Sequence, residues 1–526
     1  MSVSNSNIGE DHTISFYKEV KDSSQKVSGQ RKITPLALQS LNTYTADGSG
    51  DSQNTYFGIG ISIVNSTKIL IGSKDKKSHP VSSLAGGSVF EFVYNPTDPD
   101  ADGGVWVQTT AINPSDIASI NSPTSMDFGY SVSSYDGYVA VGAPGTNYAA
   151  TNDQNRGAVY LYQSKSDGYH EQAKLQPISE QILYFGQVLK FDQKSNKLAV
   201  GVPLYDSTAS SDCGAVFVFK SSSTGGWERE AILTSSESGA SHKIGHAVDF
   251  SGSYILAGAP AKSASGISGA GKAYLFNSSS SGGWNELSIF QSSNPTSFGY
   301  YGESVSLFSN NRAIIGEQNG KSHGNTTGSA EIIKFSSEGV KTVLTTLKNT
   351  ITGSALTDFG RFVSSYSNGS YVAISRPSAA TGASNNTDGH EEGRRAVLIY
   401  SSGSNGEWNL YKTLTRDQSK ATYYSSSPGS WFNAFNSTAQ PVALLDMNDG
   451  IVLHGLPAAA DSNFRPTSGS PFGYNVGEFR VWQDEIITVT TQPPFSVGGA
   501  FPWNLRGQTT ANAYSTTVHK GSGLKS

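Results

Sequence analysis

The sequence predicts an all-β protein, a seven-bladed β-propeller of four-stranded antiparallel blades flanked by extensions that do not repeat. Three observations support this prediction. The 526 residues include 57 glycines, 24 phenylalanines and 25 tyrosines but only 15% charged residues, which favours many short strands and turns over disorder. An aromatic-glycine pair recurs at nearly constant spacing. Around each copy, β-branched and aromatic residues alternate with small or polar ones, the period-2 pattern of strands.

The first half of each unit reads as a Phe-Gly strand, a polar turn and a second strand ending near Gly-Ala-Pro. The central copies are spaced 57, 59, 57 and 58 residues apart, with their glycines at Gly129, Gly186, Gly245, Gly302 and Gly360. Another copy starts at Phe57, and a degenerate last copy starts at Phe435. We expect Gly129, Gly186 and Gly360 to lie where neighbouring backbones approach closely, because a side chain would clash there.

The second half of each unit predicts two further strands. Segments such as GAVYLY at Gly157 and GAVFVF at Gly214 recur in all seven units. Four of them are followed by a polar loop and a strand containing Trp or Tyr. One such unit cannot bury both of its faces, whereas a closed ring of units can. A solenoid with the same period is the alternative, but seven copies favour closure because a ring has no exposed ends.

The repeats divide the chain into three parts. Residues 1–54 form an N-terminal extension, in which a hairpin could latch the ring. Residues 55–490 form the propeller. Residues 491–526 form a C-terminal tail with Pro493, Pro494 and Trp503, which is expected either to be disordered or to dock on a neighbouring subunit.

The pattern Phe-Gly-x-Ser-Val, Val-Gly-Ala-Pro and Gly-Ala-Val-Tyr-Leu-Tyr resembles the FG-GAP repeat family over roughly residues 55 to 490. It is similar to the propeller of integrin alpha subunits, and more so to the short-hairpin copies of bacterial and viral proteins. The resemblance implies a propeller that serves adhesion, ligand binding or structure. Calcium-binding integrin copies carry Asp-x-Asp-x-Asp-Gly between the Phe-Gly and Gly-Ala-Pro strands. The hairpins here, such as SSYDGYV and FSGSYIL, depart from that pattern, so those calcium sites are not expected.

One other segment has the spacing of metal ligands. Asp98, Asp100 and Asp102, followed by Gly103, alternate along the hairpin between the third and fourth strands of the first unit. Alternate carboxylates on a tight loop can converge on a calcium ion. A solvated acidic turn is the other interpretation. Calcium is the only cofactor that the sequence suggests.

The remaining candidates favour structural roles. His242 and His246 flank a strand start, where a spacing of four spans roughly 13 Å, too far to share a metal. Tryptophans at equivalent unit positions could stack on sugars, but recurrence in successive units favours blade packing; they are Trp227, Trp284 and Trp408. The acidic and basic run HEEGRR at His390 is expected to be a solvated loop. No residue is predicted to be catalytic.

Composition excludes several function classes. The sequence contains no run of 18 apolar residues, so no membrane-spanning helix is predicted. The N-terminal residues lack the pattern of a secretory signal. Cys213 is the only cysteine, which excludes an internal disulfide and a cysteine-based zinc site. A net charge of −5 with dispersed Lys and Arg disfavours nucleic-acid binding.

We therefore expect a non-enzymatic binding or assembly protein. A virion surface component with a role in host attachment, such as a tail, fibre or spike protein, fits the polar, charge-poor composition. Its partners would be other virion subunits, bound through the terminal tails, and a host receptor or glycan. The alternatives are an extracellular or cell-surface lectin or adhesin, and a polysaccharide-degrading enzyme.

Overall fold

The computed structural model describes most of the repeat region and four short strands near the chain ends. The described residues are 16–19, 26–29, 57–74, 86–95, 105–116, 126–147, 155–177, 182–207, 211–222, 226–237, 239, 241–279, 283–322, 325–326, 328–348, 358–366, 369–376, 396–403, 406–415, 445–448, 451–456, 478–483, 485–489 and 516–520. None of them lies in a helix, which agrees with the predicted all-β fold.

The chain separates into two compact units. One comprises residues 36–481. The other combines residues 1–35 with 482–526. In this second unit, β1 (Phe16–Glu19) pairs antiparallel with β2 (Lys26–Gly29), and β32 (Glu485–Val489) pairs antiparallel with β33 (Thr516–Lys520).

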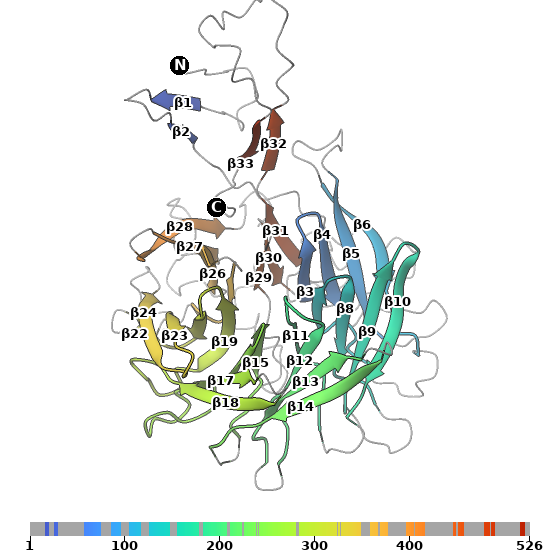
Figure 1. Cartoon of the computed structure of the whole chain (residues 1–526), viewed down its shortest axis with the longest axis vertical. Helices are drawn as coiled ribbons and strands as arrows, with labels where there is room; N and C mark the ends of the chain where they lie inside the picture. The colour runs from blue at the N-terminus through green and yellow to red at the C-terminus, as the bar shows by residue number, and fades with distance from the viewer. Residues whose placement is uncertain are drawn as a thin grey trace, which may run out of the picture. The chain divides into compact units, whose positions relative to one another are not determined.

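Six antiparallel four-stranded sheets follow one another around a ring in the larger unit (Figure 1). Each sheet is one blade, and its strands neighbour one another in sequence order. The first three blades are β3 (Phe57–Asn65), β4 (Lys68–Ser73), β5 (Ser88–Asn95) and β6 (Val105–Ile112); β7 (Ser131–Tyr135), β8 (Tyr138–Ala143), β9 (Ala158–Lys165) and β10 (Gly168–Leu175); and β11 (Val188–Phe191), β12 (Lys197–Val202), β13 (Ala215–Ser221) and β14 (Trp227–Leu233).

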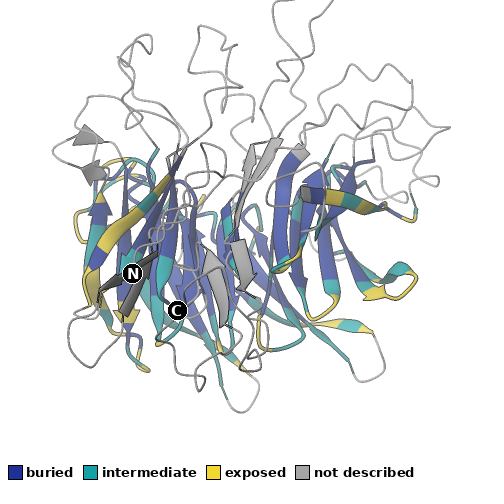
Figure 2. Cartoon of the chain, turned by 90° about the horizontal axis from the view of Figure 1, so that it is seen from above, coloured by how far each residue is buried: buried dark blue, intermediate teal, exposed yellow. Residues whose placement is uncertain are grey.

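The next three blades repeat this order, with one small hairpin inserted in the fifth. They are β15 (Ala247–Ser251), β16 (Tyr254–Ala259), β17 (Lys272–Ser278) and β18 (Trp284–Phe290); β19 (Tyr301–Phe308), β20 (Arg312–Glu317), β23 (Ser329–Phe335) and β24 (Lys341–Lys348), with the hairpin β21 (Lys321–Ser322) and β22 (Asn325–Thr326); and β25 (Val363–Ser365), β26 (Tyr371–Arg376), β27 (Ala396–Ser402) and β28 (Trp408–Thr415). Figure 2 shows that exposed residues gather on outer strands and turns.

The prediction of seven four-stranded blades is wrong in its count, because the described residues form six. The last repeat gives a three-stranded sheet of β29 (Leu445–Asn448), β30 (Ile451–Leu456) and β31 (Glu478–Gln483), in which β29 contacts both β25 and β3. The strand that follows β31 is β32, and it pairs with β33 instead of adding a fourth strand to this sheet.

Glycine pairs bring adjacent blades into backbone contact, as the sequence predicts. A Cβ atom placed on Gly142, at the end of β8, would lie 1.9 Å from the carbonyl oxygen of Gly186 in the next blade. The same approach joins Gly72 to Gly129 and Gly316 to Gly360, each also at 1.9 Å. The glycines of the Phe-Gly pairs have positive φ, for example +96° at Gly186, which side chains disfavour.

Hydrophobic clusters fill the space between blades. Phe128 and Phe185, the aromatic residues of two Phe-Gly pairs, are fully buried. Phe128 meets Tyr160 edge-on with ring centroids 5.3 Å apart, and Phe185 meets Phe217 at 6.0 Å. Edge-to-face packing adds stability beyond the buried area. The aromatic residue before the repeat glycine is therefore a core residue at these two joints between blades.

Candidate functional site: the axial channel

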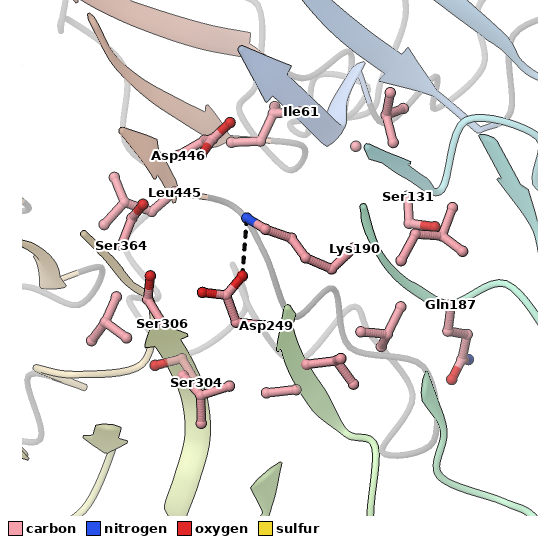
Figure 3. A pocket seen from close by; sticks show the side chains of 18 of the residues that line it. Ile61, Ser131, Gln187, Lys190, Asp249, Ser304, Ser306, Ser364, Leu445 and Asp446 are labelled. Atoms are coloured by element: carbon pink, nitrogen blue, oxygen red, sulfur yellow. Dashed lines mark ion pairs between the residues drawn. The ribbon is translucent and has the colours of Figure 1, made fainter. Parts of the chain in front are cut away.

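The innermost strands of the ring enclose a cavity of about 70 Å³ on the axis (Figure 3). The third residue after the repeat glycine is aliphatic and buried in six repeats, and Leu445 takes the corresponding place in the last repeat, which lacks that glycine. These residues line the cavity: Ile61, Val132, Leu189, Val248, Val305, Val363 and Leu445. The repeats therefore supply one continuous apolar ring around the axis.

The next position along each inner strand is polar in every repeat. These residues are Ser62, Ser133, Lys190, Asp249, Ser306, Ser364 and Asp446. In four repeats the side-chain oxygen accepts a hydrogen bond from a backbone N–H on the inner strand of the following repeat. Ser62 accepts from Ser134 N at 3.1 Å, and Ser133 from Phe191 N at 2.9 Å.

Two aspartates make the same bond and add charge to the channel. Asp249 Oδ2 accepts from Leu307 N at 2.5 Å, and Asp446 Oδ2 accepts from Ile63 N at 2.9 Å. Both carboxylates thus join one repeat to the next, and Asp446 joins the last repeat to the first. These bonds explain why short oxygen-bearing side chains occupy this position.

Lys190 replaces the acceptor side chain in the third repeat. Its Nζ lies 3.3 Å from Asp249 Oδ1, and Figure 3 shows the lysine reaching between Asp249 and Asp446. The charge of Asp249 raises the pKa of Lys190, and Asp446 adds to this effect against the opposing effect of burial. The cavity is therefore lined by one cation and two carboxylates, a formal sum of −1.

The residue directly after each glycine differs in every described repeat. The set is Ile59, Tyr130, Gln187, His246, Glu303 and Arg361. His246 Nε2 lies 3.4 Å from Glu303 Oε2. Burial would raise the pKa of Glu303, but the charges of His246 and Arg361 outweigh it and lower this pKa below its ordinary value. Apart from Ile59, the side chains of this set are polar, and Ile59, Tyr130 and Gln187 line the axial cavity.

Among the neutral side chains of this set, two polar atoms have no hydrogen-bond partner in the described residues. They are the hydroxyl of Tyr130 and Nε2 of Gln187. Both side chains line the axial cavity. Buried polar groups in folded proteins are nearly always paired with protein or water, so these two atoms mark the channel as one place where water or a ligand could bind.

The predicted calcium ligands are outside the described residues, as is the HEEGRR run. Asp98, Asp100 and Asp102 therefore remain a prediction. Within the part of the chain that the structure describes, no cluster of three or more His, Cys, Asp or Glu residues could hold a metal ion.

The two histidines form separate contacts. His242 Nε2 lies 2.7 Å from Lys262 Nζ, whereas His246 pairs with Glu303. Burial, together with the charge of Lys262, lowers the pKa of His242. Their partners belong to different parts of the fold, which agrees with the expectation that they do not share a metal.

The recurring tryptophans pack against aromatic residues. Trp227 meets Phe191 and Tyr138 with ring centroids 5.9 Å apart in both cases, and Trp284 meets Phe250 at 5.7 Å. Trp408 is 9% exposed and meets Phe308 at 6.1 Å. These contacts support the blade-packing interpretation over a sugar-stacking rim.

Sequence reasoning did not single out the channel residues. A signal was nevertheless present, because Lys190, Asp249 and Asp446 are charged at a position where the other repeats have serine. An alignment that compares the seven repeats position by position would have identified these three residues. Tyr130 and Gln187 likewise occupy the position directly after the repeat glycine, where each described repeat has a different residue.

The FG-GAP repeat family matches residues 106–162 and 227–276 of the chain. The chain is a β-propeller that carries FG-GAP repeats. Each matched FG-GAP segment starts in the fourth strand of one blade, β6 or β14, and ends in the third strand of the next, β9 or β17. The sequence repeat therefore straddles two blades.

The solved structures that match this chain are distant from it. One is a protein from Lactobacillus plantarum, with 14% identity, a TM-score of 0.39, and coverage of 78% of this chain and 94% of that one. Another is the β-propeller domain of Cps50 (Swd1) from Myceliophteria thermophila, with 9% identity, a TM-score of 0.41, and coverage of 82% and 97%. No curated protein matches the sequence. The described residues include no helix able to cross a membrane.

Proposed function

We propose that this FG-GAP propeller is a non-enzymatic binding and assembly protein of a virion surface, with a role in host attachment. The observation that carries the proposal is the division of the chain. A ring of repeats makes one compact unit, and residues from both ends of the chain make another. One unit can then serve assembly while the other binds.

The ends suit a role in assembly. The C-terminal segment contains Pro493, Pro494, Phe495 and Trp503, which combine apolar surface with restricted backbone freedom. Prolines reduce the entropy that an extended arm loses when it docks. Residues 491–526, together with 1–54, are therefore proposed to bind other virion subunits.

A structural role for the channel carboxylates supports a function without catalysis. Asp249 and Asp446 each accept a backbone N–H of the following repeat. A carboxylate held by such a bond stabilises the ring, and its replacement would lower the free energy of unfolding. We propose no catalytic residue.

Particle association tests this proposal. Antibodies raised against residues 36–481 should label purified virus particles, and the protein should co-purify with them through a density gradient. A deletion of residues 491–526 should give a soluble propeller that no longer joins particles. Normal incorporation of the deletion variant, or absence of the intact protein from particles, would contradict the proposal and favour a cell-surface adhesin.

A further inference from the structure

The axial channel holds two hydrogen-bonding groups that have no partner among the described residues. Tyr130 is 3% exposed and Gln187 is 6% exposed, and neither the phenol oxygen nor Nε2 has a partner in the described part of the chain. They come from adjacent blades and line the same cavity. An unpaired buried polar group destabilises a fold, so its presence at a cavity wall indicates a use other than stability.

Comparison of the repeats indicates that the position of Tyr130 and Gln187 does more than pack blade against blade. The position two residues further along is aliphatic in all seven repeats and forms the apolar ring. The position of Tyr130 and Gln187 carries a different side chain in each described repeat. If this position only packed blade against blade, we would expect it to repeat as the glycine and the aliphatic residue do. Its variation gives six different side chains at one equivalent position, and five of them are polar.

The two groups fix the chemistry of a ligand. Burial raises the pKa of Tyr130, with Asp127 adding to the effect, so the phenol stays protonated and can donate. Nε2 of Gln187 is a donor only. A ligand must therefore present acceptor oxygens to two blades. Lys190, Asp249 and Asp446 leave the lining with a formal charge of −1, which disfavours an anion.

The size of the cavity restricts the class of ligand further. A volume of about 70 Å³ accommodates roughly five or six water-sized groups. This is enough for a hydroxymethyl or acetamido substituent. A sugar carries several acceptor oxygens around a small neutral body, and the apolar ring beside the donors suits its C–H surface or its acetyl methyl group.

We propose that the axial channel binds a neutral saccharide, whose hydroxyl or acetamido oxygen accepts hydrogen bonds from Tyr130 and Gln187. The identification of the sugar with a host glycan rests on the proposed attachment function. The site itself does not, because binding of a free sugar can be measured on the purified protein.

Calorimetry with the full-length chain tests the site. The probes are N-acetylglucosamine and galactose, with acetate as the charged comparison, and an immobilised glycan array distinguishes a free sugar from a glycan terminus. We expect one neutral probe to bind and acetate not to bind. Tyr130→Phe and Gln187→Met should each weaken binding about tenfold or more, because each removes one donor.

Thermal unfolding provides the second readout. Tyr130→Phe should leave the Tm unchanged or raise it, because it removes a buried group without a partner. The matched control is Tyr160→Phe in the same blade. Tyr160 donates to Asp116 Oδ1 at 2.8 Å, so this variant should lower the Tm and bind the sugar normally.

Three results would overturn the proposal. One is that neither the sugars nor the array bind the wild-type protein, which would leave water as the only occupant. Another is sugar binding that both channel variants retain. The third is a Tm for Tyr130→Phe that falls as far as that of Tyr160→Phe, because the Tyr130 hydroxyl would then be paired. None of these results bears on particle association, so the two proposals can fail separately.

Discussion

Asp446 accepts a hydrogen bond from the backbone N–H of Ile63 at 2.9 Å and so joins the last repeat to the first. The two residues are 383 positions apart. The bond is equivalent to the one between Ser133 and Phe191, which joins the second repeat to the third. The ring is thus closed by the same type of contact that holds its interior joints.

Removing the acceptor at the closing joint should destabilise the propeller. Asp446→Ala leaves the N–H of Ile63 without its partner and should lower the free energy of unfolding by about 1–3 kcal/mol. Asp446→Asn retains an oxygen acceptor and should cost less. Urea unfolding measures both, with Ser133→Ala as the matched variant at an interior joint. An Asp446→Ala protein as stable as the wild type would show that this bond does not hold the ring closed.

The glycine contacts between blades predict a graded series. Gly142→Ala places a Cβ 1.9 Å from Gly186 O, a backbone atom that cannot move alone, and should destabilise by about 2–4 kcal/mol. Gly186→Val adds the strain of a positive φ and should destabilise at least as much.

Gly137 is the control for this series. It also has positive φ, but a Cβ there meets no atom within 4 Å. Gly137→Ala should therefore cost only about 1 kcal/mol. Similar Tm values for the Gly137 and Gly142 variants would refute close approach as the reason for the glycine at the end of β8.

A buried carboxyl group predicts how stability depends on pH. Glu317, at the end of β20, is 3% exposed and accepts from Ser329 Oγ at 2.9 Å and Ser292 Oγ at 3.1 Å. Burial raises its pKa from 4.5 to about 7 despite these bonds. The folded protein therefore holds more protons than the unfolded chain between these values, and stability should fall as pH rises through this window.

Glu317→Gln removes that dependence. The variant should gain up to about 3 kcal/mol over the wild type at pH 8, with a much smaller difference at pH 4.5. Chemical unfolding at the two pH values measures the change, and Glu338→Gln, at an exposed turn, is the control. Parallel stability curves for Glu317→Gln and the wild type would contradict the raised pKa.

The acidic loop of the first unit gives a calcium prediction. If Asp98, Asp100 and Asp102 hold the ion, EGTA should lower the Tm by several degrees, and Asp100→Ala should melt at this lower temperature with or without EGTA. A wild-type Tm that does not respond to EGTA would support the solvated acidic turn.

The sequence predicted the blades because each blade is local. Its four strands are consecutive, and alternation together with the Phe-Gly and Gly-Ala-Pro signals marks their ends. The blade count failed at β32, because Glu485–Val489 has the pattern of a strand but the pattern does not tell which partner it chooses. The channel could not be predicted in the same way. Lys190 and Asp249 are 59 residues apart, and they meet only because the ring brings every inner strand to one axis.

The offset between the FG-GAP repeat and the blade has a consequence for engineering. A matched segment runs from the outer strand of one blade into the third strand of the next. Excising one such segment would fuse the inner three strands of one blade to the outer strand of its neighbour, so the product would contain a hybrid blade. Clean removal of the third blade requires cuts in the loops before β11 and after β14, and Ser133 and Asp249 would then lose Phe191 and Lys190 as partners.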